Sequence, residues 1–180
     1  MRFIYIGFSA PIKFKIGAAL IKWWTSAPYS HVYLRFDSSN QKVPSNIYHA
    51  ANGMVHFKTF NNFKKENQIL KEYSLILSED KRLDILIDAM NKSSIKYGYL
   101  ELIKIFVSDI FFFLSKKEIK FKNSKGYICS ELVADMLESY FKIKFDKPKH
   151  LLKPEDIDRA MRLFIESQST VDRPTIELCG

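Results

Sequence analysis

The segment Gly126-Tyr127-Ile128-Cys129-Ser130-Glu131-Leu132-Val133 holds one of only two cysteines in this chain of 180 residues. From Cys129 onward, apolar residues recur at helical spacing, as Leu132, Val133, Met136 and Tyr140. This pattern predicts a helix over 129–140 that begins at the cysteine. The amino terminus of a helix carries unpaired backbone N–H groups and a partial positive charge, and both favour a thiolate over a thiol.

Two interpretations of Cys129 follow from this segment. In the first, a lowered pKa makes Cys129 a nucleophile, and the nearby N–H groups bind the oxyanion of a tetrahedral intermediate. In the second, Cys129 begins the apolar stripe of the helix and is a buried core residue, as free cysteines often are. The segment alone favours the buried residue, so the choice depends on the rest of the chain.

His31 changes that balance. Residues 30–36 alternate strictly and predict a strand, with Val32, Leu34 and Phe36 on one face and His31, Tyr33 and Arg35 on the other. Imidazole is the usual general base for a thiol because its pKa lies near neutral pH. We therefore expect His31 to be the general base for Cys129.

A second histidine is expected beside the first. Residues 47–51 and 54–59 flank Asn52-Gly53, a dipeptide that favours a two-residue type I′ turn. Such a turn places Ala51 opposite Met54 and His49 opposite His56. His49 lies on the face away from Tyr48 and Ala50, where it can orient the far nitrogen of His31. His56 is the rival for this role, and we prefer His49.

The remaining patterns predict strands first and helices afterwards. Strands are expected over 2–8 and 73–77, and helices over 11–24, from a Ser78 cap onward, over 99–114 and over 156–164. This order indicates an α+β fold in which an antiparallel sheet with the histidines packs against the helix with Cys129. We expect a single domain over 1–166 and a C-terminal tail over 167–180 that frays.

The net charge of +8 is high for a chain of this length. It indicates either an anionic partner, such as a phospholipid surface or a cell-wall polymer, or merely a solvated lysine surface. The lysines are scattered and form no arginine-rich tract, so a nucleic-acid partner is less favoured. The apolar run 100–114 is interrupted by three charged residues, and 1–6 is too short for a secretory signal. We expect a soluble cytoplasmic protein, and the residue usage suggests a bacterial or viral (phage) genome.

Four stretches, in this order, resemble the circularly permuted branch of the NlpC-type papain-like cysteine hydrolases. They are the Ser-His pair within 25–36, the third polar residue within 47–51, Tyr97-Gly98-Tyr99 ahead of a helix, and Cys-Ser-Glu-Leu-Val within 127–133. Lys153-Pro154-Glu155 is similar to the helix start near the end of such proteins. The chain is also similar to the lecithin–retinol acyltransferase type. It departs from the pattern at His49, where many members have glutamate, and at Gly7, where a Gly-Asp pair often stands.

The resemblance implies a hydrolase that cleaves an amide through an acyl-enzyme, with Cys129, His31 and His49 as catalytic residues. A peptide or a peptidoglycan fragment is the substrate that the NlpC type implies, whereas a lipid acyl substrate is implied by the acyltransferase type. A non-catalytic basic binding module on the same fold is the third hypothesis. We expect no cofactor and no metal, because no Cys-x-x-Cys, His-Glu-x-x-His or glycine-rich phosphate loop is present. Tyr97, Tyr99 and Phe111 to Phe113 are interpreted as core residues rather than as groove-lining ones.

Overall fold

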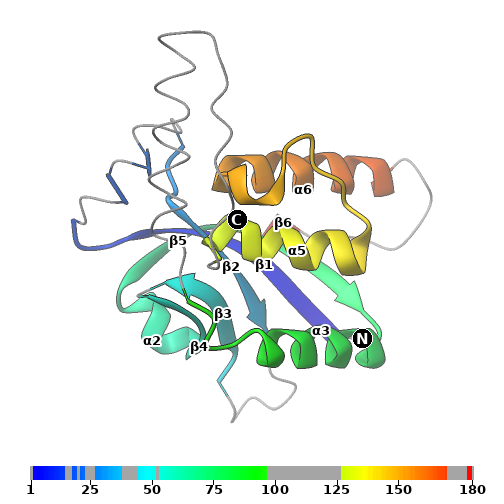
Figure 1. Ribbon diagram of the computed structural model, residues 1–180, viewed down its shortest axis with the longest axis horizontal. Helices are drawn as coiled ribbons and strands as arrows, with labels where there is room; N and C mark the ends of the chain where they lie inside the picture. The colour runs from blue at the N-terminus through cyan, green and yellow to red at the C-terminus, as the bar shows by residue number, and fades with distance from the viewer. Residues whose placement is uncertain are drawn as a thin grey trace, which may run out of the picture.

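The computed structural model of the protein describes residues 2–14, 18–19, 21–22, 27–37, 44–51, 53–96, 127–169 and 178–179. It is a mixed α+β structure, as expected (Figure 1). Its sheet has six strands in the order β4-β3-β2-β1-β5-β6, and every pair of neighbours is antiparallel. The strands are β1 (Arg2–Pro11), β2 (His31–Phe36), β3 (Asn46–Ala51), β4 (Met54–Thr59), β5 (Asn67–Leu77) and β6 (Leu178–Cys179).

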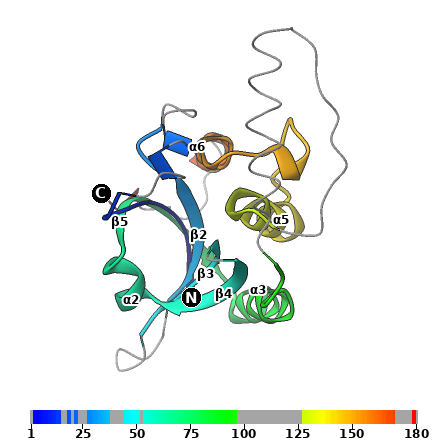
Figure 2. The ribbon, with the colours of Figure 1, turned by 60° about the vertical axis from the view of Figure 1, so that its left-hand side comes forward.

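The helices cover both faces of this sheet. The short α2 (Phe60–Lys64) lies on the concave side, whereas α3 (Glu79–Asn91) and α5 (Cys129–Phe141) lie on the other side (Figure 2). A turn of 3-10 helix, η1 (Lys149–Leu151), leads into α6 (Pro154–Ser169). Within the described ranges, no helix is long and apolar enough to cross a membrane.

The alternation in β2 divides its side chains between two cores. Val32 and Leu34 are buried in the main core together with Leu132 and Val133 of α5. On the opposite face, Tyr33 is buried in a smaller core with Ile47 and Phe63. The prediction for the two faces of this strand is therefore confirmed.

The predicted hairpin is confirmed as well. Strands β3 and β4 pair with Ala51 opposite Met54 and with His49 opposite His56. Gly53 has a φ of 92°, which an L side chain adopts only with strain, so the turn requires glycine at this position. Ser78 caps α3 as expected, because its side chain accepts a hydrogen bond from the Lys81 N–H.

Several boundaries differ from the prediction. Pro11 does not open a helix; it is the last residue of β1 and lies opposite Asn67 at the end of the β1–β5 pairing, where proline is tolerated. Helix α6 begins at Pro154 and α2 was not predicted at all, since five residues show no helical period. In the tail that was expected to fray, Leu178–Cys179 pairs with β5. The helix predicted over 99–114 lies outside the described residues.

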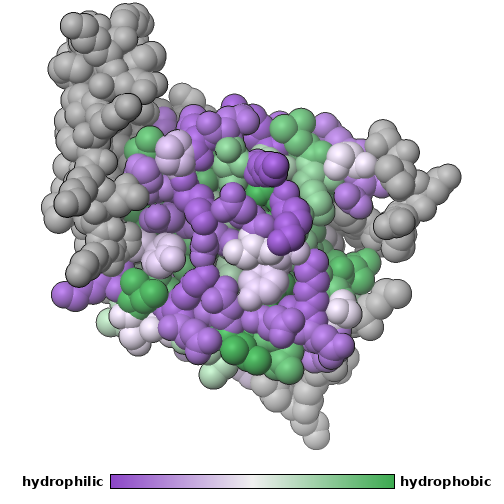
Figure 3. All heavy atoms as spheres, turned by 45° about the vertical axis from the view of Figure 1, so that its right-hand side comes forward, coloured by the Kyte–Doolittle hydropathy of each residue, from purple (hydrophilic) through white to green (hydrophobic). Residues whose placement is uncertain are grey.

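Helix α3 exposes most of the apolar residues that mark it in the sequence. Leu83, Ile87 and Met90 are exposed, whereas Ile85 and Ala89 face the core. Figure 3 shows this side of the molecule, which is largely hydrophilic with apolar side chains at its lower edge. Periodicity therefore located the helix but not the face that it buries.

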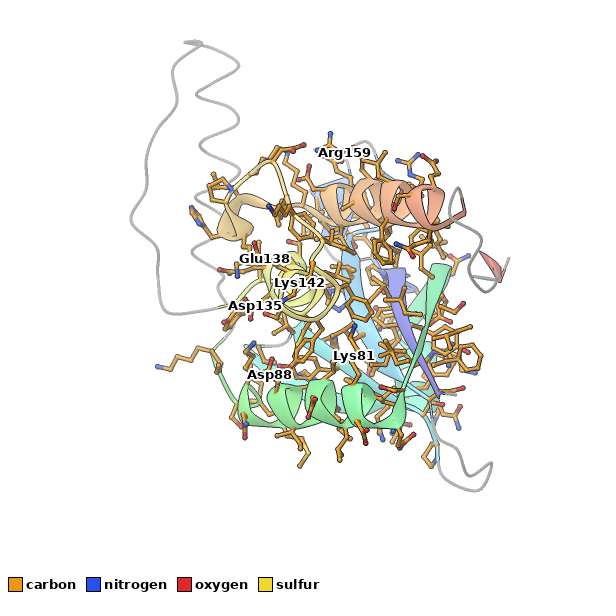
Figure 4. All side chains as sticks on the ribbon, turned by 90° about the vertical axis from the view of Figure 1, so that its right-hand side faces the viewer. Lys81, Asp88, Asp135, Glu138, Lys142 and Arg159 are labelled. Carbon is orange, nitrogen blue, oxygen red and sulfur yellow. The ribbon has the colours of Figure 1, made fainter. Side chains whose placement is uncertain are left out.

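Ion pairs connect the end of α3 to α5. The Lys92 ammonium lies 3.0 Å from a carboxylate oxygen of Asp88 and 2.5 Å from one of Asp135, and Lys149 lies 2.6 Å from the other oxygen of Asp135. Figure 4 shows Asp88, Asp135 and Glu138 on this side of the molecule. Burial is the largest single influence on the Asp135 carboxyl and raises its pKa. The hydrogen bonds and charges of Lys149 and Lys92 together outweigh burial and hold that pKa below the ordinary value. The network therefore fixes the long axis of α5 relative to α3.

A buried arginine anchors α2 to the concave face. The Arg35 guanidinium stacks 3.6 Å from the ring centroid of Tyr5 and 4.7 Å from that of Phe60, and it lies 2.7 Å from a carboxylate oxygen of Glu72. Glu72 also accepts a hydrogen bond from the Tyr33 hydroxyl at 2.9 Å. Because Phe60 belongs to α2, this cluster fixes the helix that carries Phe63.

Gly7 provides the space that Tyr33 occupies. A Cβ atom on Gly7 would lie 2.1 Å from the Cζ atom of the Tyr33 ring, which is far inside van der Waals contact. Residues 7 and 33 face each other in the β1–β2 pairing. The missing side chain of Gly7 therefore lets the tyrosine ring lie flat across β1.

We predict that Gly7→Ala lowers the free energy of unfolding by roughly 2–4 kcal/mol, because the ring of a fully buried tyrosine has to move. Urea unfolding at neutral pH measures this change. Combining Gly7→Ala with Tyr33→Leu should cost clearly less than the sum of the two single changes. Additive losses would show that the contact between residues 7 and 33 does not cause the effect.

Candidate functional site

Cys129 is the first residue of α5 and is almost fully buried, with 4% of its surface exposed. The backbone N–H groups of Val32, Ser130 and Cys129 itself lie near the sulfur and favour the thiolate. Burial acts more strongly in the opposite direction, and it raises the pKa of the Cys129 thiol above its ordinary value. The sequence-based expectation of a lowered pKa is therefore wrong for this state of the protein, because the expected N–H donors are present but the loss of water outweighs them.

His31 and His49 form a pair on neighbouring strands. Nε2 of His31 lies 3.0 Å from Nδ1 of His49, and the two rings meet edge to face with an interplanar angle of 75°. Both side chains point to the concave face of the sheet, as the alternation predicted. The geometry thus provides the contact that was expected of an orienting residue, whereas the catalytic role of the pair stays a prediction.

The histidine pair and Cys129 lie at the same end of β2 but on opposite faces of the sheet, because Cys129 belongs to the core on the Val32 face whereas both imidazoles pack against Phe63 of α2. The β2–β3 pairing runs only from Leu34 to Phe36, so His31 and Val32 lie beyond its end. The Val32 N–H near the Cys129 sulfur belongs to the peptide bond that follows His31. The thiol therefore lies near the β2 backbone next to His31, and a contact between the sulfur and the His31 ring stays a prediction.

His49 is held in the neutral form. Burial, followed by the nearby charges of His31, His56 and Lys58, lowers its pKa to about 2. Its Nε2 atom is buried and has no hydrogen-bond partner among the described residues. A neutral imidazole has one donor and one acceptor nitrogen, so when Nδ1 of His49 accepts a hydrogen bond, its own proton lies on Nε2.

His56 lies beside His49 on β4, the strand at the edge of the sheet. Its ring centroid is 4.5 Å from that of His49, and its Nδ1 atom is 3.3 Å from the Met54 carbonyl oxygen at the surface. His49, and not His56, makes the hydrogen bond with His31. The geometry therefore supports the preference for His49 as the third polar residue.

Two supporting residues were not identified from the sequence. Phe63 of α2 packs against both imidazoles, with ring-centroid distances of 6.2 Å to His31 and 5.3 Å to His49. The buried hydroxyl of Ser130 donates a hydrogen bond to the Leu152 carbonyl and so ties the start of α5 to the segment before α6. The only signal for Ser130 was its position after the cysteine, and no local pattern indicated Phe63.

A substrate cleft at Cys129, which the nucleophile interpretation requires, stays a prediction. One hollow of about 600 Å³ is lined by described residues, but these are Pro11, Ile12, Lys64 and Asn67 to Ile69, and none of them belongs to the cysteine–histidine cluster. Tyr97, Tyr99 and Phe111 to Phe113 lie outside the described residues. In the part of the chain that the structure describes, no group of three or more histidine, cysteine or acidic side chains is placed to hold a metal ion.

No model of a known protein family matches this chain, and no curated protein sequence matches it. The likeness to NlpC-type hydrolases therefore rests on the motifs quoted above. What can be said of the function depends on the geometry of Cys129, His31 and His49.

The neutral state of His49 predicts a pH dependence of stability. Its folded-state pKa of about 2 lies below the unfolded value of 6.5, so its contribution is complete above pH 6.5 and is lost as the pH falls toward 2. Below pH 6.5 we expect the free energy of unfolding to fall by up to about 1.4 kcal/mol per pH unit through this residue.

Urea unfolding at several pH values tests this dependence. His49→Asn should flatten it, whereas His56→Asn should keep it because His49 is still present. An equally steep dependence in His49→Asn would show that His49 is not the residue held neutral by folding.

Proposed function

We propose that the protein is a thiol hydrolase in which Cys129 is the nucleophile, His31 the general base and His49 the residue that orients His31. The observation that carries this proposal is the 3.0 Å contact between Nε2 of His31 and Nδ1 of His49, next to the Val32 peptide N–H that favours the Cys129 thiolate. A paired, partly buried histidine beside that peptide is not needed by a core cysteine. The arrangement supports a nucleophile over the inert buried thiol.

Two of the three groups, Cys129 and His49, are uncharged in the resting site on this proposal. The raised pKa of Cys129 keeps the thiol protonated, and His49 is neutral. His31 donates its Nε2–H to Nδ1 of His49, so the lone pair of a neutral His31 lies on Nδ1. We propose that this nitrogen is the base that takes the thiol proton.

The first half of the reaction transfers an acyl group to the sulfur. Nδ1 of His31 takes the thiol proton while Sγ attacks the substrate carbonyl carbon, and the carbonyl π electrons move to oxygen. Backbone N–H groups at the start of α5 stabilise the resulting oxyanion. The intermediate collapses to a thioester, and the leaving group departs with the proton from His31.

Water completes the cycle. His31 takes a proton from water as the water oxygen attacks the thioester, and Cys129 leaves as the thiol after it recovers that proton. The acid product is released and the site returns to its resting state. All of these steps use only the three side chains and backbone donors, without a cofactor.

The circularly permuted papain-like fold is part of this proposal. The histidine strands β2 and β3 precede the cysteine helix α5 in the chain, and α5 packs on the sheet that carries them. This order supports a permuted arrangement. By the same likeness, the favoured bond is an amide, as in a cell-wall peptide, with a lipid acyl ester as the alternative.

We predict that Cys129→Ala abolishes turnover and that His31→Gln lowers it by about 10²–10⁴-fold, the usual contribution of a general base. Hydrolysis of p-nitrophenyl esters, muropeptides and phospholipid vesicles measures this and separates the bond classes. Intact-mass analysis should find an acyl adduct on Cys129 that neutral hydroxylamine removes, as expected for a thioester. Unchanged turnover in Cys129→Ala would exclude this nucleophile.

We predict that His49→Asn keeps more activity than His49→Leu, because an amide oxygen can still accept the Nε2–H of His31 whereas leucine cannot. The pH dependence of kcat/KM is compared between the two variants, because a merely structural role of His49 would leave the shape of this dependence unchanged. Equal losses in both variants would contradict the orienting role. A protein that forms no acyl adduct and turns over none of these substrates would favour the non-catalytic binding module.

A further inference from the structure

The end of β1 carries an exposed apolar tip. Ile12 is 59% exposed and Phe14 is 81% exposed, which makes Phe14 the most exposed of the large apolar side chains in the described part of the chain. The tip is held in place, because the Ile12 N–H donates a 2.9 Å hydrogen bond to the Glu66 carbonyl in the turn after α2. An exposed phenylalanine two residues after this anchored position is costly in water, which suggests that it contacts something else.

Lysines surround this tip. Lys13 separates the two apolar residues, and Lys64 and Lys65 end the neighbouring α2; all three are exposed. Ile12 and Lys64 line the same hollow of about 600 Å³. The nearest acid in the sequence, Glu66, is already paired with Lys58 at 2.7 Å. The patch of Ile12, Lys13, Phe14, Lys64 and Lys65, here called the β1 tip, is therefore positively charged.

We propose that the β1 tip docks the protein onto an anionic phospholipid surface. Phe14 and Ile12 would enter the boundary between headgroups and acyl chains, while the lysines contact the acidic headgroups. Apolar side chains at the centre and lysines around them fit this occupant better than a nucleic acid, because the aliphatic Ile12 offers no ring on which a base can stack. The exposed stripe of α3 does not fit, because Asp80, Asp84 and Asp88 lie beside it.

The β1 tip lies close to the proposed active site along β1. Ser9 faces His31 in the β1–β2 pairing, and the tip begins three residues later, at Ile12. In Figure 1 the end of β1 and the start of α5 lie on the same side of the molecule. Docking would therefore bring His31 and Cys129 toward the membrane surface, and it would favour a lipid substrate if the proposed hydrolase activity is correct.

Co-sedimentation of the full chain with vesicles tests this proposal. Binding to vesicles that contain phosphatidylserine should exceed binding to phosphatidylcholine vesicles and should weaken as salt is added. Phe14→Glu should weaken it by at least about tenfold, from the lost apolar contact and the added negative charge. Leu163→Glu is the matched control, because Leu163 is also exposed, at 60%, but lies on α6.

Charge reversal gives a second pair of variants. Lys64→Glu should weaken binding, whereas Lys144→Glu, an exposed lysine after α5, should leave it unchanged. Cys129→Ser should bind like the wild type, so loss of activity and loss of docking can be told apart. Equal binding by Phe14→Glu and Leu163→Glu would overturn the proposal. A loss with the lysine variant but not with Phe14→Glu would also overturn it, and would indicate a site for a soluble polyanion.

Discussion

The contact between α5 and the apolar face of β2 determines where the chemistry of this protein can occur. Val32 and Leu34 on the strand pack with Leu132 and Val133 on the helix in one continuous core. This packing brings the first residue of the helix to the first residues of the strand, so the Cys129 sulfur meets the Val32 N–H. The hydrophobic packing along α5 thus fixes the position of the Cys129 sulfur relative to the Val32 N–H at the start of the helix.

The same packing creates the main electrostatic conflict in the site. Burial that holds Cys129 in place also raises the pKa of its thiol, against three N–H groups that favour the thiolate. A buried carboxylate as third residue would offset this by stabilising a positive imidazole, but His49 is neutral and cannot do so through charge. In the mechanism that we propose, His31 therefore acts as base during attack on the substrate, when the proton moves and the negative charge passes on to the substrate oxygen.

Local patterns predicted the parts of the fold that depend on local physics. The period of two in residues 30–36 gave both faces of β2, and Asn52-Gly53 gave the hairpin register that sets His49 on the same face as His31. Features that depend on distant residues escaped prediction. Pro11 ends a strand because β5 pairs with it, and the exposed face of α3 reflects which side meets α5. Likewise, the pKa of Cys129 depends on its burial by residues far away in the sequence.

The position of His49 also explains why a histidine can stand where many members of the family that the chain resembles have glutamate. Its Nδ1 atom needs only to accept one hydrogen bond from His31, and a neutral imidazole does so without the desolvation cost of a buried carboxylate. Phe63 packs against both rings beside that bond. Among the described residues, the buried Nε2 atom of His49 has no hydrogen-bond partner, and a well-packed core normally avoids such a group. A buried polar group of this kind in β3 gains little stability, which is the pattern expected when a residue is kept for its effect on its neighbour rather than for packing.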